Sequence, residues 1–339
     1  MSASTTTRAV APSVDSLLAG ASSREPFNPG DGLSDVPMEH VTIDGERLVA
    51  KWIGPRIDWV MRATGDVQAE PRVVHLWRTG VLDRLPSIDA TVQSVARDGD
   101  LHVLLMRDVS SAFLPEGHVE IPLETHRQFL DHMAGMHAAF WGFTDTAAAL
   151  CSGEMRYSAL SPAMVARERA QGYEIDGVRA AVEPGWQALV DTLPMHGEEF
   201  RALANDPRPL VAAMGGLPHT LVHGDWKAGN LGTAPDGRTV LVDWAWPGAA
   251  PGTVDLAWYL AVNPTRLPES KDATIDAYRN GLETHGISTD TWFDRALSLA
   301  LLGGLLQLGW SKTHEPDELA WWHERALPGL NLLDDASGT

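Results

Sequence analysis

The sequence predicts an α+β protein with two lobes, in which a small β-rich lobe precedes a larger and mainly helical one. Between residues 38 and 109 the chain consists mostly of strand-like segments separated by Asp-Gly turns. From residue 123 onward, apolar residues recur mainly at helical spacing. Short β-like runs at 219–245 interrupt these helices. We therefore expect an N-lobe at 24–108 and a C-lobe at 109–339.

The N-lobe contains two predicted hairpins and one helix. MEHVTI and RLVAKWI flank the pair Asp44-Gly45, which supplies the positive φ angles of a tight hairpin turn. Two further strands are expected around Asp98-Gly99. Between them, residues 66–82 carry apolar residues at helical spacing, and Pro71 indicates where that helix begins.

The C-lobe follows a turn-rich linker near residues 107–120. LETHRQFLDHMAGMHAAFWGF is strongly periodic and predicts a long helix. Further helices are expected at 160–171, 178–191, 196–205, 253–262, 270–285, 290–313 and 317–326.

Composition restricts the classes of protein to consider. The formal net charge is −19, which disfavours nucleic acid as a partner because phosphate backbones are anionic. A single cysteine, Cys151, excludes an internal disulfide and fits a reducing cytoplasm. Residues 1–23 lack the apolar core of a signal peptide and are expected to form a disordered or loosely attached leader. The most apolar stretch, 296–310, is too short for a membrane span, so we expect no membrane association.

The chemistry of the chain is concentrated at residues 221–258. His223-Gly224-Asp225 is followed by Asn230, and Asp243 lies thirteen residues further on, after the apolar run TVLV. Phosphoryl transfer requires a group that deprotonates the acceptor hydroxyl, oxygen ligands for Mg²⁺ and cations near the phosphates. Asp225 on its loop suits the base, and Asn230 and Asp243 suit the metal.

This segment resembles the aminoglycoside phosphotransferase family and its fructosamine, choline and homoserine kinase relatives. That family has the loop H-G-D-x-x-x-x-N, a strand ending in Asp, and then D-L-A, which here is Asp255-Leu256-Ala257. The resemblance implies a bilobal protein-kinase-like fold and a kinase that uses ATP, or GTP, with Mg²⁺. It implies Asp225 as base, assisted by His223, with Asn230 and Asp243 as metal ligands and Asp255 as a structural support of the loop.

Two lysines are singled out by their surroundings. Lys227 departs from the family, where His or another residue is usual, and resembles the D-x-K-x-x-N of protein kinases; we expect it to neutralise the γ-phosphate. Lys51 is the only lysine before Lys227 and lies in the apolar strand RLVAKWI. It resembles the kinase lysine that holds the α- and β-phosphates, with Glu70 as its expected partner.

The remaining nucleotide contacts are less sharply defined by sequence. A strict G-x-G-x-x-G is absent, and the phosphate-covering loop is placed at residues 33–39, with Ser34 as a contact. The strand 101–109 resembles the hinge, where Met106 would gate the adenine pocket and backbone at Arg107 to Val109 would bond the base. Met106 as an ordinary core residue remains an alternative. No Walker-type P-loop occurs.

The acceptor cannot be read from the motif. The acidic balance favours a cationic antibiotic, whereas a sugar or amino-alcohol kinase of primary metabolism fits the catalytic residues equally well. A protein acceptor is disfavoured because no A-P-E motif follows Asp243. A kinase-like nucleotide-binding or scaffolding module without turnover is the alternative from another class. The tryptophans near the loop are interpreted as packing residues, and a monomer or homodimer is expected.

Four carboxylates are candidates for acceptor recognition: Glu154, Glu168, Asp191 and Glu269.

Overall fold

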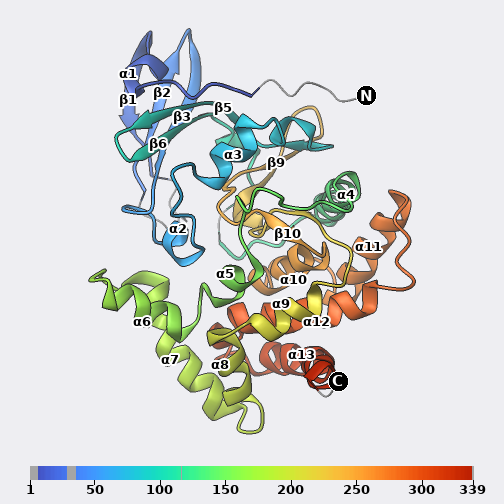
Figure 1. Cartoon of the computed structure of the whole chain (residues 1–339). Helices are drawn as coiled ribbons and strands as arrows, with labels where there is room; N and C mark the ends of the chain where they lie inside the picture. The colour runs from blue at the N-terminus through green and yellow to red at the C-terminus, as the bar shows by residue number, and fades with distance from the viewer. Residues whose placement is uncertain (1–6, 29–35, 116, 338–339) are drawn as a thin grey trace.

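The computed structural model describes residues 7–28, 36–115 and 117–337, with side chains described to residue 333 in the last helix. A β-rich lobe lies at one end of the molecule and a larger helical lobe at the other (Figure 1). This is the expected bilobal α+β architecture. Within the described residues, no helix combines the length and the apolar character that crossing a membrane requires.

The N-lobe is built on an antiparallel sheet with the strand order β1-β2-β3-β6-β5. Its elements are α1 (Val14–Leu17), β1 (Ala21–Pro26), β2 (Met38–Ile43), β3 (Glu46–Ile53), α2 (Trp59–Ala63), α3 (Arg72–Arg78), η1 (Leu82–Arg84), β5 (Val92–Asp98) and β6 (Leu101–Arg107). Both predicted hairpins are present. The β2–β3 turn has φ of 51° at Asp44 and 82° at Gly45, as a tight hairpin turn of this kind requires.

The expectation of a loosely attached leader is wrong for residues 7–23. The backbone N–H of Ala11 donates to the Val95 carbonyl at 2.8 Å, and Arg8 forms an ion pair with Asp83 at 2.7 Å. Leu18 is buried in a small core on the sheet face that also contains Val41. The apolar residues of VDSLL explain the attachment, because α1 packs them onto the sheet.

The C-lobe is mainly helical and supports two small sheets. One sheet has the order β4-β9-β8 and the other pairs β10 with β7. Its helices are η2 (Ser110–Ala112), α4 (Leu123–Ala139), α5 (Gly153–Ser158), α6 (Pro162–Ala170), α7 (Gly177–Thr192), α8 (Gly197–Asn205), α9 (Arg208–Met214), η3 (Ala228–Asn230), α10 (Thr253–Val262), α11 (Lys271–Thr284), α12 (Phe293–Leu308), η4 (Gly309–Ser311) and α13 (Pro316–Ser337). The strands are β4 (Ile88–Asp89), β7 (Thr220–Val222), β8 (Leu231–Thr233), β9 (Thr239–Leu241) and β10 (Gly248–Ala250).

Several contacts join the lobes away from the 107–120 linker, and two of them lie outside the candidate site. Strand β4, which lies between η1 and β5 of the N-lobe in the sequence, pairs in parallel with β9 of the C-lobe. On the other side, α2 lies towards α6 (Figure 1). There Arg62 of α2 donates from Nε to both carboxylate oxygens of Glu168 at 2.9 and 3.0 Å, and Arg179 of α7 donates to Glu168 at 3.3 Å.

Candidate active site

The predicted catalytic loop begins where β7 ends. Gly224 has φ of 81°, and a Cβ at this position would collide with Arg156 Nη1 and the Trp246 carbonyl. The conformation and the space both require glycine here. The sharp turn sends the side chain of Asp225 out of the strand direction, into the cluster described below.

Asp255, at the first turn of α10, holds the loop backbone. Its carboxylate accepts the backbone N–H groups of His223 at 2.8 Å and Gly224 at 2.7 Å, and His137 Nε2 at 3.2 Å. Burial alone would raise the pKa of Asp255, but the hydrogen bond from His137 and the nearby guanidinium of Arg156 hold that pKa below its usual value. These contacts agree with the supporting role that the D-L-A resemblance implied.

The ring of His223 is bonded to backbone through both nitrogens. Nε2 donates to the Val242 carbonyl at 3.1 Å, and Nδ1 accepts the backbone N–H of Asp225 at 3.2 Å. Burial lowers the pKa of His223, which agrees with this neutral tautomer. His223 thus bonds the loop to the residue that follows β9, and both of its ring nitrogens are occupied by backbone groups.

Three side chains bond the carboxylate of Asp225, which is 4% exposed. Oδ2 accepts from Asn230 Nδ2 at 2.8 Å and pairs with Lys227 Nζ at 2.9 Å, while Oδ1 accepts from Trp258 Nε1 at 2.8 Å. The Asn230 amide also donates to the Asp225 carbonyl. The loop therefore brings the candidate base, amide and lysine into direct contact.

Asp243 follows β9 and joins the same cluster. The Val242 N–H donates to the Asn230 carbonyl at 3.2 Å, which places Asp243 beside the loop, and its φ of 63° turns the chain away from the strand. Lys51 Nζ contacts Asp243 Oδ1 at 3.1 Å. Burial would raise the pKa of Asp243, yet the charges of Lys51 and Lys227 lower it.

The predicted ion pair between Lys51 and Glu70 is wrong. Glu70 precedes α3, whose N-cap is Pro71, and its carboxylate bonds Arg78 at 2.6 Å and His75 at 3.3 Å on that helix.

Burial alone would lower the pKa of Lys51, but the charges of Asp243 and Asp58 outweigh it and raise that pKa. Asp58, the buried N-cap of α2, was missed from sequence. Its one signal was an Asp directly before the short apolar run Trp59, Val60 and Met61.

The other predicted nucleotide contacts lie on β6 or outside the described residues. Met106 pairs with Val49 and Leu104 pairs with Lys51, so Met106 and Lys51 share one face of the sheet. The side chain of Arg107 pairs with Asp89, and its N–H donates to the Thr91 carbonyl at 3.1 Å. Val109 is the N-cap of η2. Of the predicted phosphate-covering loop at 33–39, residues 33–35 with Ser34 fall outside the described residues, and Met38 and Glu39 begin β2. The hinge role of Met106, Arg107 and Val109 stays a prediction.

The candidate acceptor carboxylates occupy unlike environments. Glu168 is 1% exposed and saturated by Arg62 and Arg179, so it is a structural residue. Glu269 pairs with Arg127 at 3.2 Å. Glu154 and Asp191 lie on exposed helix faces.

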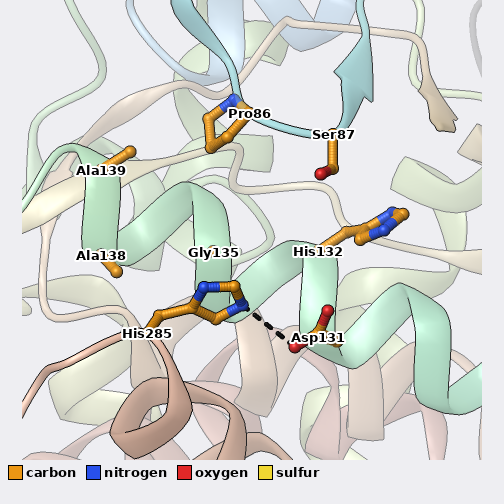
Figure 2. A pocket seen from close by; sticks show the side chains of 8 residues that line it. All are labelled: Pro86, Ser87, Asp131, His132, Gly135, Ala138, Ala139 and His285. Carbon is orange, nitrogen blue, oxygen red and sulfur yellow. Dashed lines mark hydrogen bonds and ion pairs between the residues drawn. The ribbon is translucent and has the colours of Figure 1, made fainter.

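One cavity of about 300 Å³ lies between α4, residues 86–87 and His285, and its lining contains none of the predicted site residues (Figure 2). His285 and Asp131 form an ion pair across it at 3.0 Å. In the described part of the chain, no group of three or more His, Cys, Asp or Glu side chains is arranged to hold a metal. A metal at the loop would therefore need Asn230 and phosphate oxygens besides Asp243.

Comparison with solved structures identifies the fold. An aminoglycoside phosphotransferase from Alicyclobacillus acidocaldarius matches with a TM-score of 0.50 and 17% identity, over 97% of this chain and 98% of that one. A spectinomycin phosphotransferase, solved with ADP and spectinomycin, matches with a TM-score of 0.50 and 12% identity over 93% and 88% of the two chains. A phosphotransferase solved with GDP and kanamycin gives a TM-score of 0.50 and 12% identity over 94% of each chain.

No family model matches the sequence, and no curated protein matches it either. The solved structures that do match show that the fold is of the bilobal, kinase-like class. More particularly, the chain has the fold of the aminoglycoside phosphotransferases, as the motif predicted.

Proposed function

We propose that this protein is a small-molecule kinase that transfers the γ-phosphoryl group of a nucleoside triphosphate to a hydroxyl group. The observation that carries the proposal is the convergence of Asp225, Asn230, Asp243, Lys51 and Lys227 in one contact network. These are the types of residue that phosphoryl transfer needs, and they come from both lobes.

Each residue has a role that its position supports. Asp225 accepts the proton of the acceptor hydroxyl as its oxygen attacks phosphorus. Lys51 and Lys227 are cations that compensate the phosphate charge. The amide oxygen of Asn230 and the carboxylate of Asp243 are hard oxygen donors that suit Mg²⁺, which would neutralise the β- and γ-phosphates when bound.

For the substrates, we favour ATP and a hydroxylated antibiotic. Two structures with this fold contain ADP with spectinomycin and GDP with kanamycin, which supports a nucleotide and a small acceptor. The formal net charge of −19 favours a cationic acceptor at long range. We further propose that the protein works in the cytoplasm.

A transfer assay tests the proposal. The protein is incubated with Mg·ATP or Mg·GTP and a panel of aminoglycosides, sugars and amino alcohols, and phosphorylated products are detected by mass spectrometry. We expect a product with at least one acceptor. Asp225→Asn should lower kcat by on the order of 10²-fold or more and leave nucleotide affinity nearly unchanged, because only the base is lost. Full activity of that variant would remove Asp225 from the mechanism. Mg²⁺-dependent nucleotide binding without any product would favour a non-catalytic module.

A further inference from the structure

Trp258 directly follows the D-L-A segment and contacts the candidate base. It lies on α10, three residues after Asp255, so both side chains project from the same face at the start of that helix. Asp255 holds the loop backbone, and the Trp258 indole donates to Asp225 Oδ1 at 2.8 Å. One helix end therefore fixes both the base's backbone and its carboxylate.

The two oxygens of Asp225 are unequally occupied. A carboxylate offers about four lone-pair positions, two on each oxygen. Oδ2 meets Asn230 and Lys227, and within residues 7–28, 36–115 and 117–337 Oδ1 receives only the hydrogen bond from Trp258. The remaining acceptor position is thus on Oδ1, beside the indole.

The indole itself is held in place. Trp258 is 7% exposed, and its ring lies against Trp246 with centroids 6.0 Å apart and planes at 32°. Trp246 is tethered in turn, because Arg156 donates to its carbonyl at 2.6 Å. A fixed donor on one side of Oδ1 restricts the rotation of the carboxylate about its last torsion.

We infer that Trp258 is a positioning residue for phosphoryl transfer, and that it orients Asp225 so that Oδ1 receives the hydroxyl proton. The inference rests on the proposed function. In the step, the acceptor O–H bond breaks, its proton goes to Oδ1, the new O–P bond forms, and the bond from γ-phosphorus to the bridging oxygen breaks with the diphosphate leaving. Among the described residues, Lys227, Asn230, His223 and Asp243 also lie around the carboxylate.

Trp258→Phe keeps the ring and removes only the donor. Release of phosphate from Mg·ATP with water as acceptor needs no identified substrate. A hydrogen bond to a charged group corresponds to roughly a 10- to 100-fold effect, so we expect kcat to fall by about that factor with nucleotide KM unchanged. The matched control, Trp292→Phe, removes an indole donor that is also 7% exposed but bonds the Ser288 carbonyl at the start of α12, and it should stay within about twofold of wild type. Thermal unfolding of each variant checks that it is folded.

A double-mutant cycle separates positioning from general support. In an Asp225→Asn background, Trp258→Phe should have no further effect on phosphate release, because the carboxylate that it orients is gone. If the double variant instead releases phosphate more slowly than Asp225→Asn by the same factor that Trp258→Phe causes alone, the inference is wrong.

Proton NMR provides a readout that does not require turnover. The Trp258 indole N–H signal, assigned by its loss in Trp258→Phe, should shift in Asp225→Asn, whereas the Trp246 signal should move less. An unmoved Trp258 signal would overturn the inference. If the signal shifts but the wild-type protein neither binds Mg·ATP nor releases phosphate, the contact exists and the proposed function fails instead.

Discussion

The predicted catalytic loop (residues 223–230) and the connection between β3 and α3 (residues 54–71) are both held by a buried carboxylate, but in different ways. Asp255 receives two backbone N–H groups and a histidine, all from the loop or the adjoining helix α4. Glu168 receives two guanidinium groups, one of them from the other lobe. The first arrangement fixes a local backbone conformation. The second fixes how α2, which carries Asp58, sits on the C-lobe.

The comparison also shows which contacts a local sequence motif can predict and which it cannot. Asp255 occurs at a fixed distance from Asp225 because its partners are the loop's own backbone amides. Glu168 and Arg62 are 106 residues apart and belong to helices whose packing no local pattern specifies. Four substitutions or conditions test the contrast, in order of decreasing expected effect.

Asp255→Ala should have the largest effect. It leaves the amides of His223 and Gly224 and the ring of His137 buried without an acceptor, and each such group costs about 1–3 kcal/mol. We expect a loss of several kcal/mol in urea unfolding and no detectable phosphoryl transfer. A variant that retained near-normal stability and activity would show that the loop holds its conformation without this anchor.

Glu168→Gln should come next. Removing the charge leaves Arg62 and Arg179 buried beside a neutral amide, and breaking a buried pair in this way costs about 3–5 kcal/mol. Equilibrium urea unfolding measures the loss. Unlike Asp255→Ala, the variant should still transfer phosphate at a temperature where it is folded, because the catalytic loop is intact. Equal loss of activity in the two variants would remove the distinction between the regions.

Lowering the pH should destabilise the predicted catalytic loop before it destabilises the contacts of Glu168 with Arg62 and Arg179. Burial lowers the pKa of His223 in the folded protein, so between its ordinary value near 6.5 and the lower folded value the unfolded chain binds more protons. The contribution of His223 to the free energy of unfolding is fully present above about pH 6.5 and decreases as the pH falls. The guanidinium groups around Glu168 keep their charge throughout. Hydrogen exchange at pH 7 and pH 5, corrected for intrinsic rates, should show reduced protection at 221–230. Equal loss at 59–63 would contradict the expectation.

Glu183→Gln should have the smallest effect and is the matched control for Glu168→Gln. Glu183 pairs with Arg169 at 2.6 Å and links the same two helices, α6 and α7, but both side chains are more than 40% exposed. Exposed pairs contribute about 0–1 kcal/mol. A urea midpoint close to wild type is expected, and a shift as large as that of Glu168→Gln would mean that burial is not what matters.

Much of the candidate site was predictable because its geometry is local. Asp225 and Asp243 follow short buried strands, and Asn230 ends the short helix η3 just before β8. The turn at Gly224 and the bond between Val242 and Asn230 bring the three residues together within one segment. The two hairpins of the N-lobe were predictable for the same reason, since Asp-Gly turns determine their register.

The contacts of Lys51 were not predictable in this way. The partner expected at helical distance, Glu70, lies before Pro71 and turns to Arg78 instead. The attachment of residues 7–23 was also missed, because their few apolar residues show no periodicity until α1 is placed on the sheet. The donor role of Trp258 was hidden for a similar reason. A buried tryptophan near a motif is usually a packing residue, and only the direction of its N–H distinguishes this one.

The lysines of this protein have a practical consequence for chemical labelling. The sequence contains four, Lys51, Lys227, Lys271 and Lys312, and each pairs with a carboxylate. The most accessible of their side chains is Lys227, at 26%. Amine-reactive reagents therefore find no freely solvated lysine among them. An acylating nucleotide analogue should modify Lys51 or Lys227 with little labelling of Lys271 and Lys312, and excess ATP should protect both Lys51 and Lys227.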